Sequence, residues 1–364
     1  MKYIKGLNGI RAISILMVLT THLGTFDNFS GGFFQNRVFN LFSGTTGVNI
    51  FFTLSGFLIT RLLYLEKTTF NTVSFKNFYA RRFLRLLPPL LIFYTAIAVL
   101  MLLGTIPSTY KGFLLSFFYL YNFVFHQYYT PELGHTWSLA VEEQFYILWP
   151  FILGILSTAK SLLFASLLIL LCAIALYMSN VNIGWPGHMH PLSAFYFFER
   201  GFIPAAAPIM VGCIASVLCL QYKNTAAALV AKYSIGILFL CVGLYTAPIW
   251  VPETMLPLFG IIQAVGIAIF IVWLLFNQQS VVCNILETTP LAYLGKISYG
   301  LYVYQGLFLT TGTNGKLAIQ HFPQNVMLAF MCAVLSYEFM EKKVLKYKKN
   351  FPMQPAAAGD IVDL

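Results

Sequence analysis

Charged residues are scarce in this chain of 364 residues, since Asp, Glu, Lys and Arg together make up only 9% of it. A typical soluble domain carries roughly 25%. Hydrophobic residues make up 59% of the chain, and the mean hydropathy is +0.76. This composition argues against a soluble domain and predicts an all-α integral membrane protein, because helices satisfy their own backbone hydrogen bonds in lipid.

Cysteine is also sparse, and no Cys-x-x-Cys motif occurs. The six cysteines lie in apolar segments or at their ends, without neighbouring histidines, at positions 172, 213, 219, 241, 283 and 332. We therefore expect thiols that pack as small hydrophobic groups. The pattern predicts neither a disulfide framework nor a metal site.

Apolar runs of about 20 residues, the length that crosses a bilayer, recur along the whole chain. We expect ten transmembrane helices, near 7–25, 43–65, 87–104, 138–158, 161–179, 200–220, 234–250, 256–277, 292–312 and 325–341. The stretch 112–125 is too short to cross and predicts a re-entrant or interfacial helix. The first segment lacks a small-residue cleavage site, so we expect it to remain as a span. We expect one membrane domain over 1–349 and a short flexible tail over 350–364.

Positive charge is distributed unevenly between alternate loops, and the formal net charge is +10. With ten spans, one set of loops holds most of the Lys and Arg residues, including the lysine-rich segment 342–349. The other set holds only Arg37, Lys111 and Lys316. The positive-inside rule then places both termini in the cytoplasm. The basic excess is a topology signal, and no nucleic-acid partner is needed to explain it.

Two ionisable residues, Arg11 and His22, lie inside the first apolar segment. Eleven helical steps make about three turns, so both side chains share one face roughly 16 Å apart. Ionisable side chains within a span are costly and mark a functional site by default. The spacing predicts a cation near one membrane surface and a titratable imidazole deep below it.

Three arginines, Arg81, Arg82 and Arg85, lie at the edge of the third span, just before Pro88 and Pro89. We expect the prolines to begin a helix and to gather the arginines about its N-terminus. Guanidinium groups and a helix N-terminus both suit phosphate oxygens. The alternative is a positive anchor that touches anionic lipid.

The fourth span begins with Trp137 and Ser138, and Glu142 and Glu143 follow. Ser138 can cap this helix. Adjacent glutamates point about 100° apart, so at most one of them faces the same cavity as His22. Glu142 is the better candidate to orient the imidazole, by the logic of a catalytic dyad. The alternative is a pair of interfacial glutamates facing water or headgroups.

Other polar residues are weaker candidates for the same site. They are Asn49 and Ser55 in a glycine-rich span, Arg200, and Ser298, Tyr299 and Tyr302 in the ninth span. Close helix packing explains the glycine-rich span as well, and an interfacial belt explains the tyrosines. Arg200 is either a gate residue or a headgroup anchor. The histidines at 126, 188, 190 and 321 are expected to be solvated in outside loops.

Taken in order, these clusters resemble the pattern of the membrane-bound acyltransferase-3 family. That pattern has an Arg-x10-His first helix, a Gly-Val-x-x-Phe-Phe-x-Leu-Ser-Gly-Phe stretch and an Arg-x-x-Arg loop. A Trp-Ser-Leu-x-x-Glu-x-Gln-Phe-Tyr stretch and a late Ser-Tyr-x-x-Tyr element follow. Here the elements fall on Arg11 and His22, 47–57, Arg82 and Arg85, 137–146 and 298–302, so that the resemblance covers residues 4 to about 345.

Two positions depart from the family pattern. Asn8 stands where an aspartate is common, and Gln305 stands where many members have histidine, so neither is assigned a catalytic role. The SGNH esterase-like domain that is frequent in the family is not expected here.

The resemblance implies transfer of an acetyl or other acyl group from cytoplasmic acetyl-CoA to a hydroxyl of an extracytoplasmic glycan. A lipopolysaccharide O-antigen or an exopolysaccharide at a bacterial inner membrane would be such an acceptor. The expected catalytic residues are His22, Glu142 and Arg11, with Arg81, Arg82 and Arg85 on the CoA phosphates.

Several alternatives stay open. The acceptor could be an exported small molecule or lipid, and the protein could instead be a membrane scaffold or a sugar-binding module. A secondary transporter is disfavoured because the chain has neither an inverted repeat nor a matched pair of broken helices. Direct transfer and an acyl-histidine relay are not separated by the sequence, nor is the oligomeric state.

Overall fold

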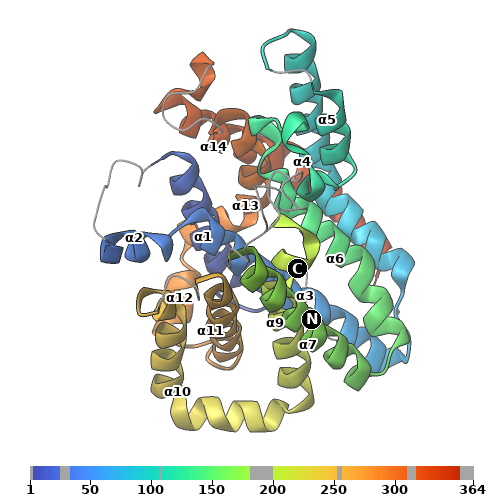
Figure 1. The fold of residues 1–364 in the computed structure, drawn as a ribbon. Coiled ribbons are helices and arrows are strands. Elements are labelled where there is room, and N and C mark those ends of the chain that lie inside the picture. Colours follow the sequence, from blue (N-terminus) through green and yellow to red (C-terminus); the bar gives the residue numbers. More distant parts are fainter. Residues whose placement is uncertain are drawn as a thin grey trace.

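A computed structural model describes residues 3–24, 33–106, 109–180, 200–251, 256–309 and 317–352. The chain is built from helices (Figure 1), which confirms the all-α prediction. Each of the ten predicted spans corresponds to one helix. These are α1 Leu7–His22, α3 Gly44–Phe70, α4 Phe75–Leu102, α6 Thr136–Ile155, α7 Thr158–Asn180, α9 Ala207–Gln221, α10 Lys223–Thr246, α11 Leu256–Phe276, α13 Thr289–Phe308 and α14 Gln324–Ser336.

Five segments are long and apolar enough to cross a membrane by themselves. They are Arg37–Phe70, Phe75–Leu102, Thr158–Tyr177, Lys223–Ile249 and Leu258–Phe276. Other predicted spans are shorter, with 16 residues in α1 and 15 in α9. α10 bends at Tyr233, where the backbone leaves helical geometry, so its first turns run across the bundle (Figure 1).

Several short helices join the long ones. They are α2 Phe33–Asn40, α5 Tyr110–Phe117, α8 Phe202–Ala205, α12 Val281–Leu286, the π-helix η8 Tyr337–Glu341 and α15 Lys342–Leu345, with 3₁₀ turns between them. The helix expected over 112–125 is shorter than predicted, because it ends at Phe117. With 8 residues it is about 12 Å long, too short to cross a bilayer.

The prolines of the third span do not begin a helix, and this part of the sequence prediction is wrong. α4 begins at Phe75, and Pro88 and Pro89 lie inside it. Proline removes a backbone donor, but neighbouring helices can supply partners within a membrane bundle. The carbonyls that lose their helical donors to Pro88 and Pro89 are those of Leu84 and Arg85. Next to them, the Tyr299 hydroxyl of α13 donates to the Leu86 carbonyl, at 3.1 Å.

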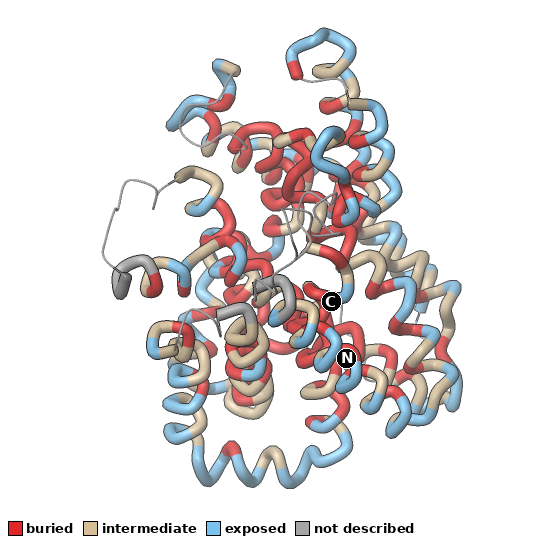
Figure 2. The backbone as a smooth tube through the Cα atoms, viewed as in Figure 1, coloured by how far each residue is buried: buried red, intermediate tan, exposed pale blue. Residues whose placement is uncertain are grey.

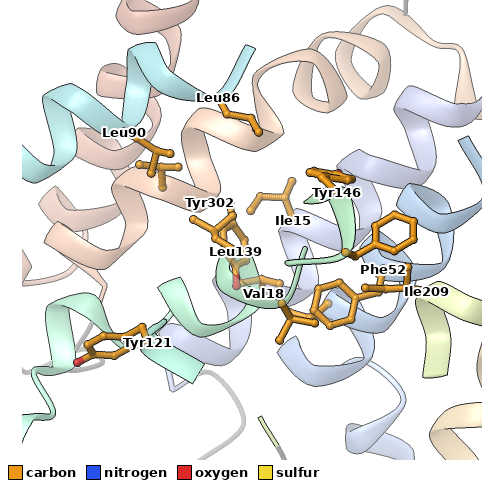
Figure 3. Close-up of a cluster of buried hydrophobic side chains, with 14 of the residues drawn as sticks. Ile15, Val18, Phe52, Leu86, Leu90, Tyr121, Leu139, Tyr146, Ile209 and Tyr302 are labelled. Carbon is orange, nitrogen blue, oxygen red and sulfur yellow. The ribbon is translucent and has the colours of Figure 1, made fainter. Parts of the chain in front are cut away.

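The buried core lies where α1, α3, α6, α9 and α13 meet, and the exposed residues lie toward the outside of the bundle (Figure 2). Ile15, Phe52, Leu139 and Tyr302 are among the buried side chains that gather there (Figure 3). Large apolar side chains on α7, such as Leu163, are exposed. This pattern is typical of a bundle whose solvent is lipid.

Glycines allow the central helices to approach closely. A Cβ at Gly56 of α3 would overlap the Ile209 carbonyl of α9, and one at Gly212 of α9 would overlap the Thr53 carbonyl of α3. Gly47 packs in the same way against Ser14 of α1. Small residues have this function in membrane helices generally, so the packing interpretation of the glycine-rich span is correct for its glycines.

Hydrogen bonds tie the helix ends together on two sides of the bundle. On one side, Lys67 donates to the carbonyls of Leu153 and Leu156, at 2.7 and 2.6 Å, and Lys5 donates its backbone N–H to Gln278, at 2.8 Å. We call this side, which also holds residues 342–349, the lysine-rich end. On the opposite side, the buried Arg37 donates to the Pro248 carbonyl, at 3.0 Å.

All six cysteines are free thiols, and five of them are buried. Histidines 126 and 321 are exposed, whereas the histidines at 188 and 190, like residues 353–364 of the predicted tail, lie outside the described residues.

The contact between α3 and α9 predicts a position-dependent effect of added methyl groups. Gly56→Ala and Gly212→Ala should each lower the free energy of unfolding by about 1–3 kcal/mol, because the helices must separate. A lower midpoint of thermal unfolding in detergent would show this. Gly243→Ala on α10, where nothing lies within 4 Å of the new Cβ, is the matched control and should not lower the midpoint.

Candidate active site

A small cavity of about 90 Å³ lies among α1, α3, α4, α6 and α13, and we call it the inner cavity. Nine of the predicted site residues line it, namely Arg11, Ser55, Arg82, Arg85, Ser138, Glu142, Ser298, Tyr299 and Tyr302. Figure 3 shows Leu86, Leu139, Tyr146 and Tyr302 at this place. Residues from five distant segments therefore meet around one space.

The inner cavity carries an excess of positive charge. Arg11, Arg82 and Arg85 line it, and Glu142 supplies its one carboxylate. Arg11 donates to the Asn8 side chain at 3.1 Å, and the Arg82 guanidinium lies over the ring of Tyr146, 4.8 Å from its centroid. Within the described part of the chain, Arg82 and Arg85 donate no hydrogen bond to protein atoms. Their donors are therefore available to a ligand in the cavity that they line.

Glu142 is held by two hydroxyl groups. Ser55 of α3 and Tyr146 of α6 both donate to its Oε1 atom, Tyr146 at 2.5 Å. Tyr146, which the sequence analysis does not select, completes this cluster because it lies one helical turn after Glu142. No hydrogen bond joins Glu142 to His22 among the described residues, so the expected dyad is not formed in this structure.

The remaining predicted residues lie outside the inner cavity. Arg81 donates to the Phe351 carbonyl at 2.8 Å, which ties the start of α4 to the C-terminal segment. Glu143 does not line the inner cavity and points about 100° away from Glu142 on the same helix. Asn49 faces Gly260 of α11.

His22 ends α1 on the side opposite the lysine-rich end, and it is partly buried. It does not line the inner cavity, although it is close enough to Arg200 and His135 for their charges to interact. The Arg200 guanidinium lies 5.3 Å from the centroid of the Trp137 ring. Trp137 in turn meets Phe52, a residue of the cavity wall, with ring centroids 6.1 Å apart.

His135 is a buried residue of this region that the sequence analysis did not select. Its ring lies between Phe93 and Tyr302, at centroid distances of 5.3 and 5.6 Å. Tyr302 donates to the His135 carbonyl at 3.1 Å and hydrogen-bonds with Ser138. A signal was present in the sequence, because His135 lies two residues before Trp137, the first residue of the Trp-Ser-Leu stretch.

Gln305 continues the cavity-facing stripe of α13 outward, since it lies three residues after Tyr302 and seven after Ser298. The side chain is 1% exposed, and neither its oxygen nor its nitrogen has a hydrogen-bond partner.

The described residues contain no group of three or more His, Cys, Asp and Glu side chains arranged to hold a metal.

Comparison with known proteins supports an enzymatic site. The model of a family described as "Acyltransferase domain" matches residues 4–337. The chain is 30% identical, over 94% of its length, to a "putative peptidoglycan O-acetyltransferase YrhL" of Bacillus subtilis. It is 29% identical, over 95% of its length, to the "peptidoglycan O-acetyltransferase OatA" of Listeria monocytogenes.

A "putative O-acetyltransferase" of Staphylococcus aureus is also 29% identical, over 94% of this chain. The matched regions cover 55%, 56% and 57% of these three relatives, so the chain spans little more than half their length. No solved structure matches the chain significantly.

Three arginines lie close together in the inner cavity, so we expect their mutual repulsion to lower the free energy of unfolding. Arg85→Met removes one of three mutually repelling cations and keeps an unbranched apolar side chain. We expect the free energy of unfolding to rise by about 1–4 kcal/mol, as when other buried charges are replaced by apolar groups. Thermal unfolding in detergent measures this. Arg81→Met is the control and should not stabilise, because it loses a hydrogen bond; a lower midpoint for Arg85→Met would refute the prediction.

Proposed function

The chain belongs to the acyltransferase family whose domain model matches residues 4–337; from this premise, we propose that it transfers an acetyl group from acetyl-CoA to a hydroxyl of a cell-wall glycan. The observation that carries the proposal is the inner cavity, where three guanidinium groups face one carboxylate inside a membrane bundle. Such charges are costly in a membrane, and they are retained where function needs them.

The arginines suit the chemistry of a thioester. Attack on the acetyl carbonyl places negative charge on its oxygen and then on the departing sulfur. Preorganised donors in a site that excludes water stabilise such charge strongly. The unsatisfied donors of Arg82 and Arg85 and the nearby Arg11 supply this stabilisation at the inner cavity.

The transfer breaks one bond and forms one. His22 does not line the inner cavity, so the side chains that separate the two must move before the reaction. The oxygen of the acceptor hydroxyl then attacks the acetyl carbon, its proton passes to the imidazole of His22, and the C–S bond to CoA breaks. The thiolate that leaves takes up this proton from the imidazolium and departs as CoA, so that His22 returns to its neutral form. An acyl-histidine relay would insert one further transfer, first to the imidazole and then to the hydroxyl.

Glu142 acts within the cavity in this proposal, and not as the partner of His22. Its carboxylate accepts from Ser55 and Tyr146 and limits the repulsion among the arginines that line the same cavity. Trp137 packs against Phe52 of the cavity wall and Arg200 lies over the Trp137 ring, so both are proposed as positioning residues at the outer end of the path.

The acceptor is proposed to be peptidoglycan. The names of the Bacillus and Listeria relatives specify peptidoglycan, which favours it over the lipopolysaccharide and exopolysaccharide acceptors suggested by the sequence. Peptidoglycan lies outside the cell membrane, so donor and acceptor would approach from opposite ends of the bundle. We place the lysine-rich end and both termini in the cytoplasm, following the positive-inside rule.

Loss of the imidazole is expected to abolish transfer without loss of folding. His22→Ala should lower acetyl transfer at least about 100-fold, because general-base assistance is worth roughly 10²–10⁴ in rate. Radiolabelled acetyl-CoA supplied to inverted vesicles that contain acceptor glycan measures this. His126→Ala, a change of an exposed histidine, should retain activity. Normal activity of His22→Ala in equal amounts of membrane protein would remove the central claim.

The orientation is tested with single cysteines in a background whose six native cysteines are replaced by alanine. Cysteines at the exposed positions Lys76, Gln127 and Lys343 should differ in reactivity toward an impermeant thiol reagent added to intact cells. Only the cysteine at 127 should react, and all three should react once the membrane is opened. Reaction at 76 or 343 in intact cells would overturn the orientation and the assigned acceptor side.

A further inference from the structure

A second and larger cavity, of about 590 Å³, opens at the lysine-rich end, and we call it the vestibule. Its walls come from the N-terminal segment and the start of α1, Arg85 of α4, the first half of α13 and the C-terminal segment from Tyr337 to Lys349. Its size falls within the range of small-molecule sites, roughly 300–1,000 Å³. The inner cavity, at about 90 Å³, is too small for a nucleotide.

The vestibule is strongly basic. Five lysines line it, namely Lys296, Lys342, Lys346, Lys348 and Lys349. Arg11 and Arg85 add two further cations, against Glu341 as the one lining carboxylate. Ser336 donates to Glu341 at 2.9 Å and partly satisfies its charge. Lys342 pairs with Glu338 at 3.0 Å, but both side chains are exposed, so this pair withdraws little charge.

The backbone of the C-terminal wall is unusual. Tyr337–Glu341 forms a π-helix between α14 and α15. Such turns are rare and occur frequently at functional sites. Here both Tyr337 and Glu341, from opposite ends of the π-helix, line the vestibule, and Tyr3 and Tyr299 add two more phenol rings.

The two cavities adjoin. Arg11, Arg85 and Tyr299 line both of them. A ligand with a polyanionic head in the vestibule could therefore extend a narrow chain into the inner cavity. A CoA thioester has this form, because its nucleotide carries the phosphates and its pantetheine arm carries the acyl group.

We propose that the vestibule binds the phosphorylated nucleotide end of the acyl donor through Lys296, Lys346 and Lys349, while the arm passes Arg11 and Arg85 into the inner cavity. This inference rests on the proposed function and assigns the phosphates to lysines of the C-terminal segment and α13. Arg82 and Arg85 then serve the thioester, and Arg81 is structural.

The lysines of the vestibule would recognise phosphate groups, and an anionic lipid headgroup also carries phosphate. The vestibule's connection to the inner cavity favours the donor, since a headgroup has no need of that passage. The variants Lys346→Gln with Lys349→Gln separate the two sources. Both lysines are exposed, so their replacement leaves the packing of the bundle intact.

Binding is measured first, without turnover. Free CoA should raise the midpoint of thermal unfolding of the wild-type protein in detergent, and pantetheine, which lacks phosphate, should not. The double variant should lose this stabilisation. The control is Lys76→Gln with Lys343→Gln, which changes net charge equally at exposed lysines outside the vestibule; it should behave as wild type. If CoA gives no lysine-dependent stabilisation, or phosphatidylglycerol gives it instead, the inference is overturned.

Turnover is measured second, with acetyl-CoA and with S-acetylpantetheine as donors. The double variant should raise the KM for acetyl-CoA about ten- to a hundredfold with little change in kcat, and added salt should reduce the difference. Its KM for S-acetylpantetheine should not change. An equal effect on both donors, or an equal effect in the control variant, would overturn the inference. If CoA binds in a lysine-dependent manner but no acetyl group is transferred, the inference about the vestibule stands and the proposed function is refuted.

Discussion

Positive charge held inside an apolar bundle is the constraint on which this structure depends. Arg11, Arg82 and Arg85 cannot face lipid, so the helices that carry them must enclose a polar space. The inner cavity provides that space, and only Glu142 offsets the charge there. Glycine contacts between α3 and its neighbours α1 and α9 bring the backbones close enough to close the bundle around it. Close packing of the helices is therefore what keeps these charged side chains away from lipid.

Helix positions could be predicted because span length follows from bilayer thickness. Apolar runs of about 20 residues mark where helices cross, whatever their partners are. The prediction was wrong where a local rule competed with the membrane environment. Pro88 and Pro89 would begin a helix in water, but within the bundle α4 continues through them, and Tyr299 of α13 bonds to the preceding turn. This contact between two helices could not be predicted from the sequence alone.

Only part of the membership and geometry of the candidate site could be predicted. The helical period indicated that at most one of two adjacent glutamates faces the same cavity as His22; Glu142 lines the inner cavity, but His22 does not. The partner of its carboxylate depended on how α3 lies against α6, which fixes Ser55 opposite Glu142. The period of one helix has no information on the angle between two helices. For the same reason the lysines of 342–349 were interpreted as a topology signal alone, although four of them also line a cavity.

The arrangement along α1 relates these parts to one another. Arg11 lies where the vestibule and the inner cavity meet, and His22 lies about 16 Å further along the same helix. Phe51, Phe52 and Tyr302 form an aromatic part of the wall of the inner cavity, which His22 does not line. The ring centroids of Phe51 and Tyr302 lie 6.3 Å apart, and those of Phe52 and Trp137 lie 6.1 Å apart. A thioester that reaches the arginines is therefore still separated from the imidazole by this wall. Side chains can change rotamer where backbones fixed by glycine contacts cannot separate, so passage of an acyl group to His22 requires movement of these rings and not of the helices.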